Sequence, residues 1–304
     1  MTGQAVMRNR LLILYTPRAR TPFHEHVGDD QLAAMAGALA DGGWQVELAA
    51  YAPDQIAATL ARTRPELVFN LAYGFEGPAG RELQPETARR LEELCARCVG
   101  ATAGAQQVAQ DKHRTSEVAR RAGIGVPRRV SAGDAWAGWV VRKPRFGACH
   151  RDVTIVDRQA LPAWNDSEYV VESYIAGEEY TVGVLQLGDT PIALPVMRLA
   201  FAQPAQPHTA DFARFPWSAV IERDDRYALR ALALRCFRVL DLQDYARFDI
   251  RIGPHGPVLL DANALPNLAP GVSVFPRLAH AQGLAYPELI RALARAAARR
   301  HRLV

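Results

Sequence analysis

Polar side chains at alternate positions mark a predicted β-hairpin in the last quarter of the chain. Its two strands cover residues 245–252 and 257–264. Because side chains two apart in a strand share a face, the polar positions of each strand should form one row. They are Arg247, Asp249 and Arg251 in the first strand and Asp261 and Asn263 in the second. If the turn brings the rows into register, two carboxylates and one amide oxygen converge beside an arginine.

Hard oxygen ligands at this spacing suit Mg²⁺, which takes few protein ligands and completes its shell with water and phosphates. The alternative is a surface hairpin whose polar side chains face solvent, because the other face of both strands is apolar. Cationic residues elsewhere in the chain that could bind phosphate would favour the metal site over the surface hairpin.

Lysine is almost absent from this sequence. Of 36 basic residues only Lys112 and Lys143 are lysines. An ammonium is a compact point charge that a planar guanidinium cannot replace. Lys112 opens a predicted helix and Lys143 ends a predicted strand, so both could reach phosphate oxygens beside bound Mg²⁺. Chance survival of two lysines is the alternative. No G-x-x-x-x-G-K-[ST] motif is present, which excludes a P-loop.

The elements that must position these residues begin with an alternating pattern. Apolar runs and helical periodicity predict strand, helix, strand, helix, strand and helix in order. The segments are 11–15, 30–42, 45–51, 53–62, 67–73 and 85–97. This order predicts an open parallel sheet in an α/β unit. No G-x-G-x-x-G follows the first strand, so a dinucleotide site is not expected there.

The middle of the chain changes to shorter segments. A helix begins at Asp111 and closes with Gly123, and a small antiparallel sheet is predicted after Pro127. Its strands are expected at 138–143, 152–156, 169–175, 179–187 and 191–198. A Pro-rich loop at 200–220, a helix at 224–240, the hairpin, a loop at 264–274 and a helix at 285–302 complete the prediction.

Five sequence blocks together resemble the D-alanine–D-alanine ligase family of ATP-grasp enzymes, over about residues 65–290. They are FNLAYG with REL (69–83), QDKHRTSEVARRAGIGVP (110–127), VVRKPRFG (140–147), VVESYIAGEEYTVGV (170–184) and YARFDIRI with LLDANALPN (245–267). The resemblance implies an α/β (α+β) ATP-grasp fold in three parts. These are an N-terminal α/β domain (1–108), a central subdomain (109–186) with an adenine hinge near 172–175, and a C-terminal subdomain with the Mg²⁺ site (187–304).

The resemblance also implies ATP and two Mg²⁺ ions, with Mn²⁺ as a substitute, in an ADP-forming C–N ligase that works through an acyl phosphate. Nucleotide-binding positions would be Lys112, Lys143, Glu172, Tyr174, Ile175 and, at the ribose, Glu179. Metal ligands would be Asp249, Asp261 and Asn263. Arg247 would stabilise the oxyanion, Arg214 would reach the γ-phosphate from its loop, and Ser273 would hold a substrate carboxylate. Further substrate positions would be Glu25, Tyr73, Arg81 and Glu82.

Departures from the family pattern lie around the substrate. Residues 147–152 (GACHRD) replace a lid that normally carries serines, TPFHEH (21–26) follows the first strand, and Tyr73 stands where a histidine is usual. These changes favour an amino-acid ligase of specialised metabolism, such as antibiotic biosynthesis, over a D-alanyl-D-alanine product. The alternatives are an intramolecular cyclo-ligase of the D-cycloserine synthetase type, a true D-alanine–D-alanine ligase, and a nucleotide-binding regulator with an inactive site.

Composition restricts the remaining classes. The net charge is +4 and the pI about 9.0, but basic residues are scattered among acidic ones, so no nucleic-acid partner is expected. No apolar run is long enough to span a bilayer, and the N-terminal apolar run has only five residues, which predicts a cytoplasmic protein that does not enter membranes. Cys95 and Cys98 are expected as two small apolar residues on one helix face. Small amino-acid substrates are the expected partners, and the oligomeric state stays open, with a homodimer as one candidate.

Overall fold

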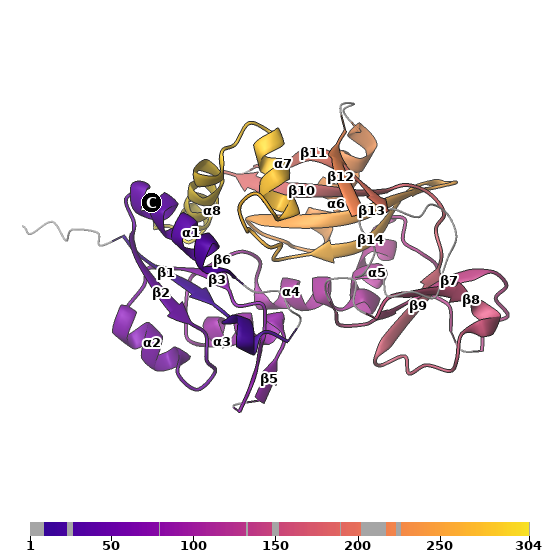
Figure 1. Cartoon of the computed structure of the whole chain (residues 1–304), viewed down its shortest axis with the longest axis horizontal. Coiled ribbons are helices and arrows are strands. Elements are labelled where there is room, and N and C mark those ends of the chain that lie inside the picture. Colours follow the sequence, from indigo (N-terminus) through magenta and orange to yellow (C-terminus); the bar gives the residue numbers. More distant parts are fainter. Residues whose placement is uncertain are drawn as a thin grey trace, which may run out of the picture.

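The computed structural model describes residues 9–22, 27–78, 80–131, 133–147, 152–188, 190–201, 217–222 and 226–303 (Figure 1). The chain first forms an α/β unit, then a small sheet at the opposite end of the molecule, then a larger sheet between them. The C-terminal helix returns to the first unit, where α8 packs on α1. No helix of the described residues has the length and apolar character needed to cross a bilayer.

The N-terminal unit contains a four-stranded sheet in the order β2-β1-β3-β6 whose strands are parallel, which confirms the predicted parallel sheet. Its strands are β1 (Arg10–Tyr15), β2 (Gln45–Ala50), β3 (Leu67–Leu71) and β6 (Cys98–Val99). Its helices are η1 (Arg18–Arg20), α1 (Asp29–Asp41), α2 (Ile56–Thr63) and α3 (Gln84–Glu93). Residues 11–14 and 67–71 are all buried. These strands are covered on both faces, which explains their continuous apolar runs.

Sequence patterns missed several short elements of this unit. They are the hairpin β4 (Phe75–Gly77) and β5 (Gly80–Glu82), the strand β6, and the helix α4 (Ala103–Gln110). The helix predicted over 85–97 ends at Glu93, Cys95 adopts φ 57°, and Cys98 begins β6. The expectation that both cysteines share one helix face is therefore wrong.

The predicted single sheet of the middle region is two antiparallel sheets. After α5 (Lys112–Arg121), the small sheet has the order β8-β7-β9, and the large one β12-β11-β10-β13-β14. The small sheet contains β7 (Trp139–Pro144), β8 (Thr154–Asp157) and β9 (Tyr169–Ser173), with η2 (Arg158–Ala160) after β8. The large sheet contains β10 (Glu179–Leu187), β11 (Thr190–Phe201), β12 (Trp217–Ile221), β13 (Tyr245–Gly253) and β14 (Gly256–Asn263).

Two expectations change as a result. The subdomain boundary expected at residue 186 falls inside β10, which pairs with β11 and β13, so the strand pairing favours a boundary before Glu179. The loop expected over 200–220 is interrupted by β12, which pairs with β11. A run that mixes proline and tryptophan carries little strand signal in one sequence, because such edge strands are specified by their neighbour.

Helices cover both faces of the large sheet. On one face α6 (Tyr227–Val239), with α4 and α5, packs on apolar side chains of β10, β13 and β14. On the other face α7 (Val274–Ala281) and α8 (Tyr286–Arg300) form a core that continues into β1 and β3 of the first unit. The rings of Tyr245 and Phe275 meet edge to face there, with centroids 5.5 Å apart. The shared core joins the sheet to the N-terminal unit.

A buried ion pair links α8 to the large sheet and to the N-terminal unit. Arg300 donates to both oxygens of Asp244, and the Asp244 carboxylate also accepts the backbone N–H of Gly100 at 2.7 Å. The Asp244 side chain is 1% exposed. Arg300 donates in addition to the carbonyl oxygens of Cys98 and Gly100.

Arg300→Met is expected to lower the free energy of unfolding by about 2–3 kcal/mol, because it leaves the Asp244 carboxylate buried without its cation. Urea denaturation monitored by circular dichroism measures this. Arg299→Met changes an exposed neighbour on the same helix and should stay within about 0.5 kcal/mol of the parent. Equal losses in both variants would show that the pair with Asp244 contributes nothing specific.

Candidate active site

The hairpin has the register that the alternating pattern predicts. Asp249 of β13 lies opposite Asp261 of β14, and Arg247 lies opposite Asn263. Directly opposed residues project from the same face of a sheet, so the two carboxylates and the amide share a face. Nη2 of Arg247 lies 3.1 Å from Oδ2 of Asp249. The Asp249 side chain is 10% exposed and that of Asp261 is 36% exposed, which places the pair at the edge of a buried region.

The donor set fits Mg²⁺ held together with a phosphate ligand. Among the described residues, no three His, Cys, Asp or Glu side chains gather as a closed metal centre. Here two carboxylates stand side by side, and Oδ1 of Asn263, which accepts the backbone N–H of Leu265 at 3.1 Å, has a second lone pair left. Mg²⁺ commonly binds one or two carboxylates plus phosphate and water. When bound, the ion would neutralise charge on phosphate oxygens.

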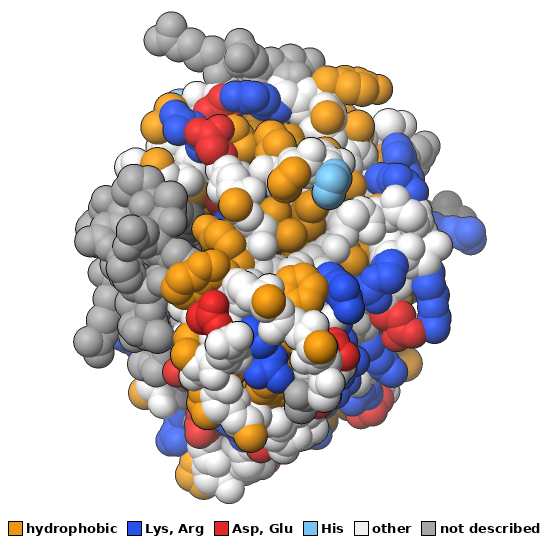
Figure 2. All heavy atoms as spheres, turned by 90° about the vertical axis from the view of Figure 1, so that its right-hand side faces the viewer, with side chains coloured by type: hydrophobic (Ala, Val, Ile, Leu, Met, Phe, Trp, Pro, Cys, Tyr) orange, Lys and Arg blue, Asp and Glu red, His pale blue; other side chains and the backbone are white. Residues whose placement is uncertain are grey.

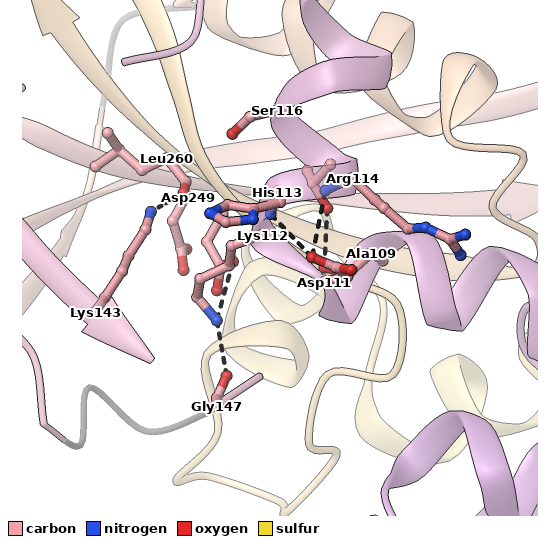
Figure 3. Close-up of polar contacts among 12 residues, drawn as sticks. Ala109, Asp111, Lys112, His113, Arg114, Ser116, Lys143, Gly147, Asp249 and Leu260 are labelled. Carbon is pink, nitrogen blue, oxygen red and sulfur yellow. Dashed lines mark hydrogen bonds and ion pairs between the residues drawn. The ribbon is translucent and has the colours of Figure 1, made fainter. Parts of the chain in front are cut away.

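A β-bulge next to Asp249 and Asp261 leaves a backbone carbonyl of β14 available to Lys143. The register shifts between Asp249 and Ile250, so that Leu260 of β14 is the extra residue. An extra residue in a bulge leaves the regular hydrogen-bond ladder. The Leu260 carbonyl accepts from Nζ of Lys143 at 3.0 Å, and Figure 3 shows this lysine extending from β7 to β14.

Lys143 is buried in an ion pair. Its Nζ lies 2.7 Å from Oε2 of Glu172, a residue that is 3% exposed on the neighbouring strand β9. Burial disfavours the ammonium, but the carboxylates of Glu172 and Asp261 outweigh it and hold the pKa of Lys143 above its usual value. Oγ of Ser116 on α5 donates to the other oxygen of Glu172 at 3.4 Å. The ammonium is thus charged and fixed.

Lys112 approaches from the start of α5. Its Nζ donates to the Gly147 carbonyl at 2.9 Å and lies 3.9 Å from Oδ1 of Asp261. Burial lowers the pKa of Lys112; the charge of Asp261 opposes this shift and that of Lys143 adds to it. Figure 3 shows the two lysines coming from different elements, with Nζ of Lys143 directed to Leu260 and Nζ of Lys112 to Gly147. The two predicted phosphate-binding lysines and the predicted metal ligands are therefore brought together.

One ion pair that sequence patterns did not reveal fixes the lysine-bearing segments to each other. Arg145 donates to both oxygens of Asp111, at 2.9 and 2.7 Å. Burial would raise the pKa of Asp111, but the hydrogen bonds from Arg145 hold it below its usual value. The same carboxylate caps α5 by accepting the N–H groups of His113 and Arg114, and the N–H of Lys112 donates to the Arg145 carbonyl at 3.2 Å. The pair therefore sets the spacing of Lys112 and Lys143.

The predicted adenine hinge is the connection between the two antiparallel sheets. β9 ends at Ser173 and β10 begins at Glu179, so Tyr174 and Ile175 lie between the sheets. Gly177 has φ +139°, and a Cβ there would lie 2.1 Å from the Ile252 carbonyl oxygen, so only glycine fits this close approach. Glu179 is 7% exposed and pairs with Arg251, which sits opposite it on β13.

The expected substrate residues of the N-terminal unit follow β3 or lie on β5. The strand order reverses between β1 and β3, and ligands of open parallel sheets bind beyond the carboxyl ends of strands at such a point. Tyr73, just after β3, is 1% exposed and packs in the core that includes Tyr245 and Phe275. Glu82 accepts hydrogen bonds from Tyr51 and Arg90. Arg81 is exposed on β5.

Ser273 immediately precedes α7 and donates its hydroxyl to Oδ1 of Asn267 at 3.1 Å. Because a hydroxyl has one proton, Ser273 must turn from Asn267 before it can donate to a substrate carboxylate. Glu25 and Arg214 lie outside the described residues, as do His24, His26 and residues 148–151 of the predicted lid.

Comparison with known proteins gives one consistent family. Residues 158–295 match the family model described as the D-ala D-ala ligase C-terminus. The D-alanine–D-alanine ligase of Desulforudis audaxviator is 28% identical over 292 residues, covering 88% of this chain and 92% of that one. That of Mycobacterium sp. strain KMS is 29% identical over 284 residues, covering 84% and 74%. The structure of Bacillus anthracis D-alanine–D-alanine ligase complexed with ATP superposes with a TM-score of 0.69 at 19% identity, covering 97% and 99%.

The fold and the converging groups define an ATP-grasp enzyme, an ADP-forming ligase that joins a carboxylate to an amine. The expected α/β (α+β) ATP-grasp fold is confirmed. Within that class the chain is similar in sequence and fold to D-alanine–D-alanine ligases, the family that its sequence blocks resemble.

Proposed function

We propose that this protein joins two amino acids through a peptide bond, with ATP and Mg²⁺, and that D-alanine is the first substrate to test. The observation that carries the proposal is the meeting of Lys112, Lys143, Asp249 and Asp261, which come from three separate segments. Cations and metal-binding carboxylates in one place suit a nucleoside triphosphate whose γ-phosphoryl group is transferred. The relatives named above are D-alanine–D-alanine ligases.

The proposed reaction has two balanced steps. A substrate carboxylate oxygen attacks the γ-phosphorus, the bond to the β-phosphate oxygen breaks, and ADP leaves an acyl phosphate behind. The amine of a second amino acid then attacks the acyl carbon, inorganic phosphate leaves with the C–O bond electrons, and the nitrogen loses a proton to solvent or phosphate. Lys112 and Lys143 would hold phosphate oxygens, and Arg247 would stabilise the oxyanion of the second step.

The nucleoside is proposed to lie at the hinge. The backbone of Tyr174 and Ile175 would face the base, Glu172 would support this edge, and Glu179 would bind a ribose hydroxyl. Asp249, Asp261 and Asn263 would hold two Mg²⁺ ions. The three-part division of the chain remains part of the proposal, with the central part ending before Glu179. A cytoplasmic location, where ATP and free amino acids are present, is proposed with it, and a homodimer is a candidate assembly.

Two features bear on the choice of substrate. The comparisons give no support to a specialised-metabolism role, because the relatives are named D-alanine–D-alanine ligases. Tyr73, which replaces the usual histidine, is buried in the core, so this departure alters packing more than an open pocket. The sequence of residues 147–152, which lacks the usual serine hydroxyls, favours a second candidate in which another amino acid replaces D-alanine.

The test is ADP release by the full chain with ATP and Mg²⁺, across D- and L-amino acids offered singly and in pairs, with product masses recorded. We expect D-alanine alone to give ADP and a product of two alanines less one water. Turnover restricted to another amino acid would move the assignment to the second candidate. A product with the mass of one substrate less one water would identify ring closure. If no amino acid, offered singly or in pairs, gave ADP release, the protein would be a nucleotide-binding regulator rather than a ligase.

A further inference from the structure

Arg251 is the member of the polar row on β13 that contacts the predicted hinge and Glu179. It is 8% exposed and two residues beyond Asp249. Its Nη2 donates to Oε2 of Glu179, and its Nη1 donates to the Ile175 carbonyl at 2.9 Å. The guanidinium carbon also lies 5.5 Å from the ring centroid of Tyr174. One buried cation therefore contacts three residues of the proposed nucleoside site.

The surrounding backbone holds this arrangement rigidly. Arg251 and Glu179 are direct partners in the β10–β13 ladder, so their ion pair is fixed by two strands of the large sheet. The connection that carries Ile175 is docked on the end of β13, where the N–H of Ile252 donates to the Glu178 carbonyl at 3.2 Å. Arg251 thus ties the hinge and the ribose-facing carboxylate to the same strand as Asp249.

We infer that Arg251 is a positioning residue for the nucleoside half of the ATP site, an inference that rests on the function proposed above. The planar guanidinium presents two N–H groups in a fixed fork, and here they orient one carboxylate and one carbonyl. Each acceptor keeps free lone pairs. The second oxygen of Glu179 can take a ribose hydroxyl, and the Ile175 carbonyl can still accept an amino group of the base.

This role separates nucleoside binding from phosphate binding. Lys112 and Lys143 contact Asp261, Glu172 and the carbonyls of Gly147 and Leu260, whereas Arg251 contacts the hinge and Glu179. Loss of the guanidinium should therefore weaken ligands that contain adenosine and leave ligands made of phosphate alone unaffected. A lysine at this position keeps the charge but cannot hold both acceptors in one plane, so it should restore binding only in part.

The experiment compares Arg251→Met and Arg251→Lys with the parent chain. Inhibition constants are measured for adenosine and for Mg²⁺-tripolyphosphate, together with KM for ATP, kcat and the melting temperature. Arg300→Met is the matched control, because Arg300 also bridges a buried carboxylate and backbone carbonyls, but at the far end of the sheet. Its melting temperature should fall while both inhibition constants stay at the parent values.

For Arg251→Met we expect KM for ATP and the inhibition constant of adenosine to rise about tenfold or more, with tripolyphosphate inhibition and kcat unchanged. Arg251→Lys should fall between this variant and the parent, which keeps the test informative if the methionine variant does not fold. Equal weakening of adenosine and tripolyphosphate, or no change in adenosine binding, would overturn the inference. A parent chain that binds tripolyphosphate directly but neither binds adenosine nor releases ADP from ATP would overturn the proposed function itself.

Discussion

Asp249→Asn should reduce ADP release by two to three orders of magnitude while leaving the fold intact. The Asp249 carboxylate stands opposite Asp261 on the paired strand, and Oδ1 of Asp261 lies 3.9 Å from Nζ of Lys112. Asparagine has the same shape but no charge, so it removes one of the two anionic ligands that Mg²⁺ would need there. Losing metal stabilisation of a developing charge removes several kcal/mol, and each 1.36 kcal/mol is about tenfold in rate.

The measurement is steady-state ADP release with Mg²⁺ and ATP saturating, together with a circular dichroism spectrum of each variant. Asp261→Asn should lose activity as well. It also removes the negative charge that lies 3.9 Å from Nζ of Lys112, so this lysine loses its ion pair. Asp241→Asn is a suitable control, since Asp241 is exposed and has φ 52°, which asparagine tolerates. Turnover near the parent value in Asp249→Asn would show that the hairpin does not hold the metal.

The placement of the polar side chains on the hairpin was largely predictable because it follows from alternation along strands. A period of two places Asp249 and Asp261 on one face, and a short turn then leaves few registers that keep the apolar face buried. The observed pairing of Asp249 with Asp261 agrees with that expectation. The bulge at Leu260 was not predictable, because an extra residue in one strand has no signature in the alternation when its neighbours are apolar.

Contacts between distant segments were also outside the reach of sequence patterns. Asp111 marks the predicted start of a helix, and in the structure its side chain caps α5, but its ion pair with Arg145 depends on how α5 meets the small sheet. Likewise Arg251 reads as one more polar residue of a strand until β10 places Glu179 beside it. The division of the middle strands into two sheets depends on the same pairing, since each strand alone fits either sheet.

At the end of the molecule formed by the small sheet, basic side chains lie among acidic ones and against aromatic rings. Figure 2 views the end of the molecule formed by the small sheet, where Lys and Arg side chains gather along one side with acidic side chains among them. Several arginines of this region stack on aromatic rings, including Arg142 on Tyr169 and Arg158 on Trp164. Such pairs hold the guanidinium against the protein surface, which leaves it less free to follow a phosphate backbone.

Lys112→Arg and Lys143→Arg should each lower kcat/KM for ATP about ten- to a hundredfold, although arginine occupies almost every other basic position. A charge-assisted hydrogen bond from a buried ammonium to phosphate is worth roughly 1.5–3 kcal/mol. A guanidinium keeps the charge but is larger, planar and fixed in direction. It cannot occupy the space of the Lys143 ammonium between Glu172 and the Leu260 carbonyl.

Lys143→Arg and Lys112→Arg should differ in stability, because the two lysines have different surroundings. Lys143 is enclosed by β7, β9 and β14, so the larger arginine overpacks a buried site and should cost about 1–3 kcal/mol of unfolding free energy. Lys112 contacts the Gly147 carbonyl at the start of the predicted lid and has no ion pair closer than the 3.9 Å to Asp261 among the described residues. Its replacement should therefore change the melting temperature less.

Steady-state kinetics with ATP varied, and a thermal melt of each variant, measure these effects. Arg121→Lys is the control, because it makes the reverse exchange at a position where the arginine side chain is 76% exposed; its kinetics and stability should equal those of the parent within about 0.5 kcal/mol. If Lys112→Arg were equally silent in kinetics, its ammonium would contribute nothing to phosphate binding. If Lys143→Arg lost stability without losing affinity for ATP, Lys143 would serve only to neutralise Glu172, and the phosphate site would have to be sought around Lys112 and Arg247.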